Sequence, residues 1–230
     1  DIDTLVYHAD IIRSVQDAQE AFRIKTREVL DRGVVEFLVY APDHPGLFAA
    51  IAGAMALGAA NILDAKVHTL NDGMVLDTFA IQSASIKESD SVNGYSRLVD
   101  RIADAIQGKI QPARELAKNQ AKIKANIADI FTVAPRVIID NNASNTHTVI
   151  EINGCDRAGL LHDVTSVITR DGLQISSALV STYGESVVDV FYVKDVFGLK
   201  IDREERLDDI KNKLLLAITE NANIDSIESR

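Results

Sequence analysis

The sequence predicts an α+β protein of two ferredoxin-like (βαββαβ) domains in tandem, preceded by an N-terminal helix. Two observations lead to this fold class. A loop that opens an apolar helix occurs twice, as DHPGLFAAIAGAM from Asp43 and as DRAGLLHDVTSVI from Asp156. Around both copies the hydrophobic pattern changes between strand and helix periods, in the order strand, helix, strand, strand, helix. One supersecondary unit therefore occurs twice along the chain.

Composition limits the kind of partner that we expect. The chain has 230 residues, 47% of them hydrophobic and 25% charged, which is ordinary for a globular protein with room for two domains. A net charge of −10 and a pI near 4.9 argue against a nucleic-acid partner. No apolar run approaches the roughly 20 residues of a membrane-spanning helix, so no membrane partner is expected. The single cysteine, Cys155, suits a cytoplasmic location.

The N-terminal part is predicted to be one helix over residues 8–31. Ile11, Val15 and Phe22 recur at helical spacing, and Gly33 is a stop signal. Residues 1–33 are therefore assigned to an N-terminal helical connector.

The first domain is expected to span residues 34–142. The tripeptide NDG at 71–73 is a hairpin signal between its second and third strands. RVIID (136–140) can supply its fourth strand, after a helical insertion at about 112–130. Its other predicted elements are a strand at 34–41, a helix at 47–58, strands at 61–70 and 74–82, and a helix at 91–108.

The polar run NNASN (141–145) marks the expected boundary, and the second domain is expected to span 146–230. Its last strand is predicted to be weak or absent, because only a short polar segment follows the final helix. Its predicted elements are a strand at 147–154, a helix at 160–172, a hairpin at 173–195 that turns at 183–185, and a helix at 203–221.

Residue spacing supports the duplication. Asp43 and Gly46 reappear 113 positions later as Asp156 and Gly159, and Asp77 reappears 112 positions later as Asp189. One residue has therefore been lost at the hairpin turn, where a deletion is best tolerated.

Two functions that this fold can host are disfavoured by the residues. RNA recognition would need basic and aromatic central strands. A phosphatase would need a glycine-rich anion loop with an arginine, and Arg157 in the second loop has only His44 as its counterpart in the first.

The repeated motif resembles the signature of ACT domains, which are small-molecule regulatory modules of amino-acid metabolism. More narrowly, NILDAKVHTLNDGMVLDTFAI and SSALVSTYGESVVDVFYV resemble the C-terminal tandem ACT region of bifunctional PII uridylyltransferase/uridylyl-removing enzymes. The resemblance implies a regulatory region without a catalytic centre of its own. No cofactor or metal is expected in this chain, although the enzyme family uses Mg.

The repeated loops are the predicted ligand sites. Backbone N–H groups at a helix start suit an amino-acid carboxylate, and Gly46 and Gly159 permit close approach. Asp43 and Asp156 could accept a hydrogen bond from the ammonium group. The candidate ligand-binding residues are Asp43, His44, Pro45, Gly46, Leu47, Phe48, Asn61, Ile62, Asp156, Arg157, Ala158, Gly159, Leu160, Leu161, Gln174 and Ile175.

The resemblance further implies that L-glutamine is the effector, that ligands lie between paired ACT domains, and that PII is contacted through catalytic domains outside this chain. Pairing of ACT domains within or between chains is expected. The alternatives are a ligand-free ACT dimerisation module and a tandem ACT regulator of another amino-acid pathway.

Structural explanations also exist for individual residues. Asp43 and Asp156 could merely cap helices, the two loop glycines could serve backbone geometry alone, and Asp77 and Asp189 read as polar groups on a sheet face. The loops differ, since Pro45 is replaced by Ala158 in the second copy. One copy could therefore bind a ligand while the other mainly builds the interface.

Overall fold

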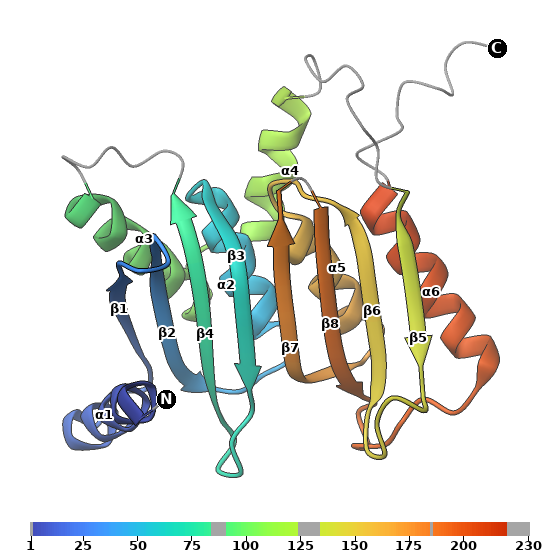
Figure 1. Ribbon diagram of the computed structural model, residues 1–230, viewed down its shortest axis with the longest axis horizontal. Helices are drawn as coiled ribbons and strands as arrows, with labels where there is room; N and C mark the ends of the chain where they lie inside the picture. Colours follow the sequence, from blue (N-terminus) through green and yellow to red (C-terminus); the bar gives the residue numbers. More distant parts are fainter. Residues whose placement is uncertain (1, 84–90, 124–133, 185, 220–230) are drawn as a thin grey trace.

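The computed structural model describes residues 2–83, 91–123, 134–184 and 186–219. Its strands form one eight-stranded antiparallel sheet in the order β1-β2-β4-β3-β7-β8-β6-β5 (Figure 1). The elements are α1 (Ile2–Ala18), β1 (Arg23–Val29), β2 (Val34–Pro42), α2 (Leu47–Leu57), β3 (Ala60–His68), β4 (Met74–Ser83), α3 (Ser91–Ile106), α4 (Pro112–Ile123), β5 (Arg136–Asp140), β6 (Thr148–Cys155), α5 (Leu160–Arg170), β7 (Gln174–Tyr183), β8 (Ser186–Lys194) and α6 (Glu204–Thr219).

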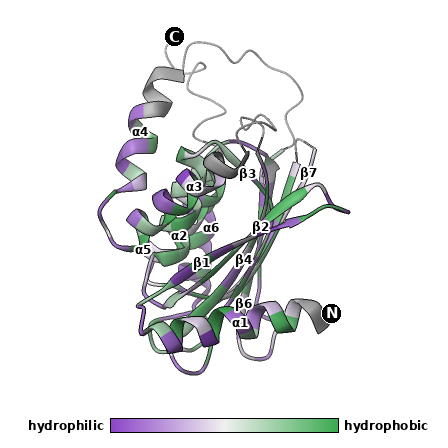
Figure 2. Ribbon diagram, turned by 90° about the vertical axis from the view of Figure 1, so that its left-hand side faces the viewer, coloured by the Kyte–Doolittle hydropathy of each residue, from purple (hydrophilic) through white to green (hydrophobic). Residues whose placement is uncertain are grey.

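The two faces of the sheet are covered differently. Helices α2 to α6 lie on one side, as Figure 2 shows, and the main core between these helices and the sheet runs through both units. Phe37, Phe79 and Phe191 are fully buried in it. On the other face, α1 packs Ile11 and Val15 against a small cluster that includes Leu38 and extends to β4. The alternation of Phe37 and Leu38 between the two clusters is the period-two pattern of a strand buried on both faces.

The tandem ferredoxin-like fold is confirmed, but the chain enters each unit differently from the predicted βαββαβ order. In both units the outer edge strand comes before the loop and first helix rather than after the second helix. The prediction of one helix over 8–31 is wrong in its second half. The helix ends at Ala18, and β1 pairs over its whole length with β2, from Arg23–Tyr40 to Val29–Val34. Gly33, with φ 60°, serves the turn between these strands.

The fourth strand of the second unit is β5. It pairs with β6 from Arg136–Asn153 to Asp140–Val149, so the prediction that residues 136–140 complete the first unit is wrong. This pairing favours a division of the chain before Arg136 instead of at 142–146. The predicted helical insertion is present as α4, but residues 124–130 lie outside the described part of the chain. Residues 220–230, for which a weak or absent last strand is predicted, also lie outside the described residues.

The remaining predicted elements are confirmed, with ends shifted by at most two residues. The two units join through β3 and β7, whose register pairs Lys66 with Leu179. These two residues occupy equivalent positions in the repeat, so the units are related by a local two-fold axis. Because β2 and β6 run in opposite directions across this sheet, the two repeated loops lie at opposite ends of it.

Helices α2 and α5 pack against each other across the same axis. The His162 Nδ1–H group donates to the Ala49 carbonyl over 2.7 Å, and these residues are again equivalent in the repeat. The alanine-rich α2 is buried nearly all round because it lies among the sheet, α3, α4 and α5. Its small side chains allow this crowding.

Candidate functional site

Both repeated loops adopt the same backbone conformation. Gly46 and Gly159 occupy the N-cap positions of α2 and α5 in the left-handed region, with φ 88° and 82°, and no side chain caps either helix. The amide of Leu47 donates to the carbonyl of His44 over 3.1 Å, and Leu160 repeats this bond in the second loop. The glycines are thus required by the turn itself. Helix capping by the loop aspartates, one of the structural explanations above, is not observed.

A cavity of about 420 Å³ lies at the second loop, on the seam between the units. Its volume falls in the range of small-molecule sites. It is lined by all six predicted residues of that loop, Asp156 to Leu161, and by Asn61 and Ile62 from the start of β3 in the other unit. The structure therefore brings together eight of the predicted residues, from both units, around one space.

The other eight predicted residues lie at the opposite end of the sheet. They are the first loop, 43–48, with Gln174 and Ile175 at the start of β7. Asp43 is exposed and accepts a 3.4 Å hydrogen bond from Thr69 Oγ1. The His44 ring is exposed and contacts the Pro45 carbonyl at 3.2 Å.

The two ends of the sheet differ in the size of the side chains on the helix that lies next to each loop. The cavity at the second loop is lined by Ala52 and Ala56 of α2. The equivalent positions of α5 carry Thr165 and Thr169, whose hydroxyls bond back to their own helix at 2.7 and 2.9 Å. The Thr169 methyl carbon lies 3.6 Å from where a Cβ on Gly46 would be. The Thr169 side chain thus occupies space next to the first loop, whereas Ala56 leaves the equivalent space open at the second.

Asp189 is a further lining residue, which reasoning from the sequence placed only on a sheet face. It lies in β8, is 1% exposed, and lines the cavity. Its Oδ1 has no hydrogen-bond partner among the described residues. Burial raises the pKa of Asp189 to about 7, a backbone hydrogen bond from Ser181 opposes the shift, and the nearby charge of Asp156 adds to it. The sequence contains one signal for this residue: an aspartate occurs at the equivalent position of both repeats, Asp77 and Asp189, within an otherwise apolar strand.

The loop carboxylate and arginine are partly engaged. Burial raises the pKa of Asp156, while a backbone hydrogen bond from Arg157 and the Arg157 charge lower it. Arg157 is held by its Nη2, which lies 2.7 Å from Asp163 Oδ2 and donates to the Ala217 carbonyl over 2.8 Å. Its buried Nε and Nη1 have no acceptor in the part of the chain that the structure describes. Among the described residues, the cavity is therefore lined by a guanidinium with two nitrogens that lack an acceptor and by a carboxyl group with one oxygen that lacks a donor.

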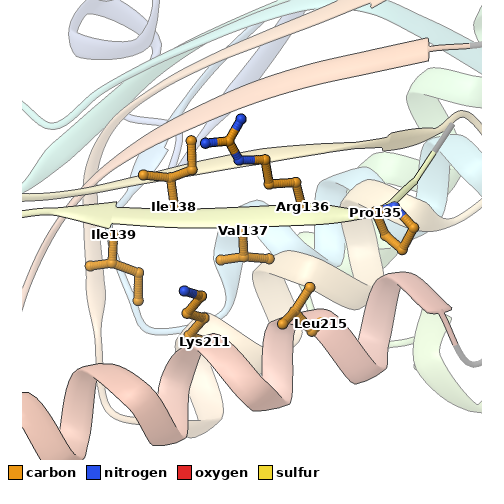
Figure 3. A pocket seen from close by; sticks show the side chains of 7 residues that line it. All are labelled: Pro135, Arg136, Val137, Ile138, Ile139, Lys211 and Leu215. Carbon is orange, nitrogen blue, oxygen red and sulfur yellow. The ribbon is translucent and has the colours of Figure 1, made fainter.

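A second cavity, of about 360 Å³, lies between the edge strand β5 and α6 (Figure 3). Val137 and Ile139 point from the strand toward Lys211 and Leu215 on the helix. None of the predicted site residues lines it. Across the described ranges, no group of three or more His, Cys, Asp or Glu side chains could hold a metal ion.

Comparisons with known proteins show what the chain is similar to. A family profile described as the N-terminal ACT domain of the ACR family matches residues 143–221. The chain is 42% identical over 224 residues to the bifunctional uridylyltransferase/uridylyl-removing enzyme of Azospirillum brasilense, which is 96% of this chain and 24% of that protein. The enzymes of the same name from Rhodospirillum rubrum and Gluconobacter oxydans are 45% and 41% identical, over 94% and 95% of this chain and 23% of each relative.

The chain thus spans about a quarter of the length of these curated relatives. Among solved structures, aspartate kinase from Synechocystis aligns with a TM-score of 0.42 and 13% identity, over 83% of this chain and 27% of that chain. Within the described residues, no helix has both the length and the apolar character to cross a membrane.

Proposed function

We propose that this pair of ACT domains, which is related over nearly its whole length to bifunctional uridylyltransferase/uridylyl-removing enzymes, is a cytoplasmic regulatory module that senses L-glutamine. In the longer protein, occupancy of the module would control the attachment and removal of uridylyl groups on PII. The catalytic steps and the contact with PII would belong to other domains of that protein.

The cavity at the seam carries the proposal. Its lining comes from the second loop and from the start of β3, so a ligand there would contact both units at once. A ligand changes a conformational equilibrium only when it binds one arrangement better than another. A site shared by two units meets this condition, because any change in their relative position changes the site.

The second loop provides chemistry suited to an amino acid. The first turn of α5 leaves backbone N–H groups without intrahelical acceptors, and the helix dipole favours an anion there. Asn61 at the start of β3 offers an amide on the opposite side of the cavity. We propose this loop as the principal site, and the first loop with Gln174 and Ile175 as a secondary site that stays empty at concentrations that saturate the principal one.

Calorimetric titration of the 230-residue chain with L-glutamine tests the proposal, with D-glutamine, L-glutamate and L-serine as controls. A sensor of cellular levels should bind with a Kd in the micromolar-to-millimolar range, roughly −4 to −8 kcal/mol. Ala56→Thr gives the cavity the side chain found at the equivalent position of α5 and should abolish binding. The reverse change at the other end, Thr169→Ala, is the matched control and should leave it intact.

Each outcome has a defined meaning. Binding of L-glutamine with one molecule per chain, lost in Ala56→Thr, supports the sensor and its site. Saturable binding of a different amino acid would favour a tandem ACT regulator of another pathway. No heat with any of them would favour the ligand-free alternative, a pairing module, for which the continuous β3–β7 seam is the supporting observation.

A further inference from the structure

The polar groups left unsatisfied around the seam cavity have opposite charges. Among the residues described, Asp189 is almost fully buried with Oδ1 unpartnered, and Arg157 has two buried nitrogens, Nε and Nη1, without acceptors. Both residues line the same space. A buried polar atom without a hydrogen-bond partner is unfavourable, and folded proteins contain few of them. Unused hydrogen-bonding atoms on one basic and one acidic side chain that line the same cavity favour a ligand with groups of both charges.

The residues around Asp189 favour a ligand cation that donates hydrogen bonds over a metal ion. Asp156 is close enough to raise the pKa of Asp189, so this end of the cavity carries two acidic groups. The apolar side chains of Val180 and Val187 complete the wall. In the described chain these carboxylates have no third metal-ligating neighbour, which a metal site would need. An ammonium group, with three donors, fits these two acidic groups better.

The surroundings of Arg157 select a carboxylate. Asp163 and the Ala217 carbonyl hold the guanidinium in place through Nη2 alone. The remaining N–H groups are thereby oriented in advance, next to the first turn of α5, where a helix also favours an anion. The two bonds at Nη2 fix the orientation of the guanidinium and leave Nε and Nη1 available as donors.

We propose that Arg157 and Asp189 bind the two charged groups of an α-amino acid zwitterion, the carboxylate on Arg157 and the ammonium on Asp189. The assignment rests on the proposed function and adds to it the two residues that bind the charged groups of the ligand. It explains why the second loop carries an arginine where the first has His44. If these two residues bind the charged groups, the other residues that line the cavity recognise the side chain of the ligand and so select the amino acid.

Titration with ligand analogues tests the assignment in the intact chain. The deaminated analogue 4-carbamoylbutanoate lacks the ammonium group, and L-glutamine amide lacks the carboxylate. Each should bind the unmodified chain roughly 30-fold or more weakly than L-glutamine, because each lacks one of the two charged groups that the site would bind. These measurements require no variant and so do not depend on how well a variant folds.

Variants then assign each charge to a residue. Asp189→Asn should weaken L-glutamine by roughly 30-fold or more while leaving the affinity for the deaminated analogue unchanged or improved. Arg157→Gln should act in the reverse sense, weakening L-glutamine but not its amide. Asp77→Asn, the equivalent change in β4, is the matched control and should leave L-glutamine binding unchanged. Thermal melting of each variant checks that it is folded.

The results distinguish two failures. If L-glutamine binds, Ala56→Thr abolishes binding, and Asp189→Asn binds as tightly as the unmodified chain, the charge assignment is overturned and the sensor proposal stands. If the unmodified chain binds none of the amino acids tested, the proposed function itself is overturned, and this inference with it.

Discussion

Gly53, in the middle of α2, offers a sharp test of how the two units pack. A Cβ at this position would lie 2.7 Å from His162 Nδ1 and 2.7 Å from Pro112 Cβ. In an open helix, replacing glycine by alanine stabilises by roughly 0.5 to 1 kcal/mol. We expect the opposite sign here, because the added methyl group has no free space between α2, α5 and the start of α4.

Two unfavourable contributions set the magnitude of the Gly53→Ala effect. Overpacking in a closely packed interior typically costs about 1 to 3 kcal/mol. Moving His162 away also breaks its 2.7 Å hydrogen bond to the Ala49 carbonyl, and leaving such buried groups unpaired costs about 1 to 3 kcal/mol. After the helix-propensity gain is subtracted, the free energy of unfolding should fall by about 1 to 5 kcal/mol.

Urea denaturation followed by circular dichroism measures this change. Gly154→Ala is the control, because nothing lies within 4 Å of its added Cβ, and it should be neutral or slightly stabilising. A double-mutant cycle with His162→Ala identifies the clash, since His162→Ala should cost less in the Gly53→Ala background than in the unmodified chain. Stabilisation by Gly53→Ala, or strict additivity in the cycle, would refute the packing described for this seam.

Three further outcomes follow from buried groups elsewhere. Burial raises the pKa of Asp77 to about 8 from 3.8, so between about pH 5 and 7 this carboxyl group is protonated in the folded chain and ionised in the unfolded chain. The free energy of unfolding therefore falls as pH rises, and the stability of Asp77→Asn relative to the unmodified chain should increase by roughly 1 kcal/mol per pH unit in urea titrations. A pH-independent difference would contradict the shift. The fully buried Thr148 hydroxyl donates to Asn141 Oδ1 over 2.7 Å and accepts from the Ile201 amide over 3.0 Å. Thr148→Val should therefore destabilise by about 1 to 3 kcal/mol in chemical denaturation, and no change would show that water replaces the hydroxyl. Leu38→Ala removes the centre of the cluster beneath α1. It should lower the free energy of unfolding by about 2 to 5 kcal/mol and raise the hydrogen-exchange rate in α1 far more than in α5. Equal protection of both helices would mean that α1 is held by other contacts.

Much of the fold was predictable because it is encoded locally. Strand and helix periods, the NDG turn and the 113-residue repeat are properties of short stretches, and each of them predicted an element that the structure contains. The segment from Arg23 to Val29 was misread as helix because its few apolar residues fit either period. Its pairing with β2, and not its own pattern, makes it a strand.

The candidate site was predictable only in part, for the same reason. The loop motif drew attention to both copies equally, since glycine and aspartate occur in each. The difference between the two ends arises from α2 and α5, where Ala56 and Thr169 face loops that lie 100 or more positions away in the sequence. Free volume is a property of side chains from several elements together, so no single stretch records it.

The sequence by itself therefore determined the duplicated unit, its inner strands and helices, the glycine-dependent loops and the acidic net charge, because each depends on composition or on residues close together in the chain. Only the tertiary structure decided which unit β5 completes, that the second loop adjoins the cavity on the seam, and that Asp189 is buried in it with Oδ1 unpartnered among the described residues. A strand pattern specifies faces but not neighbours, and a carboxylate becomes a buried charge only when other elements close over it.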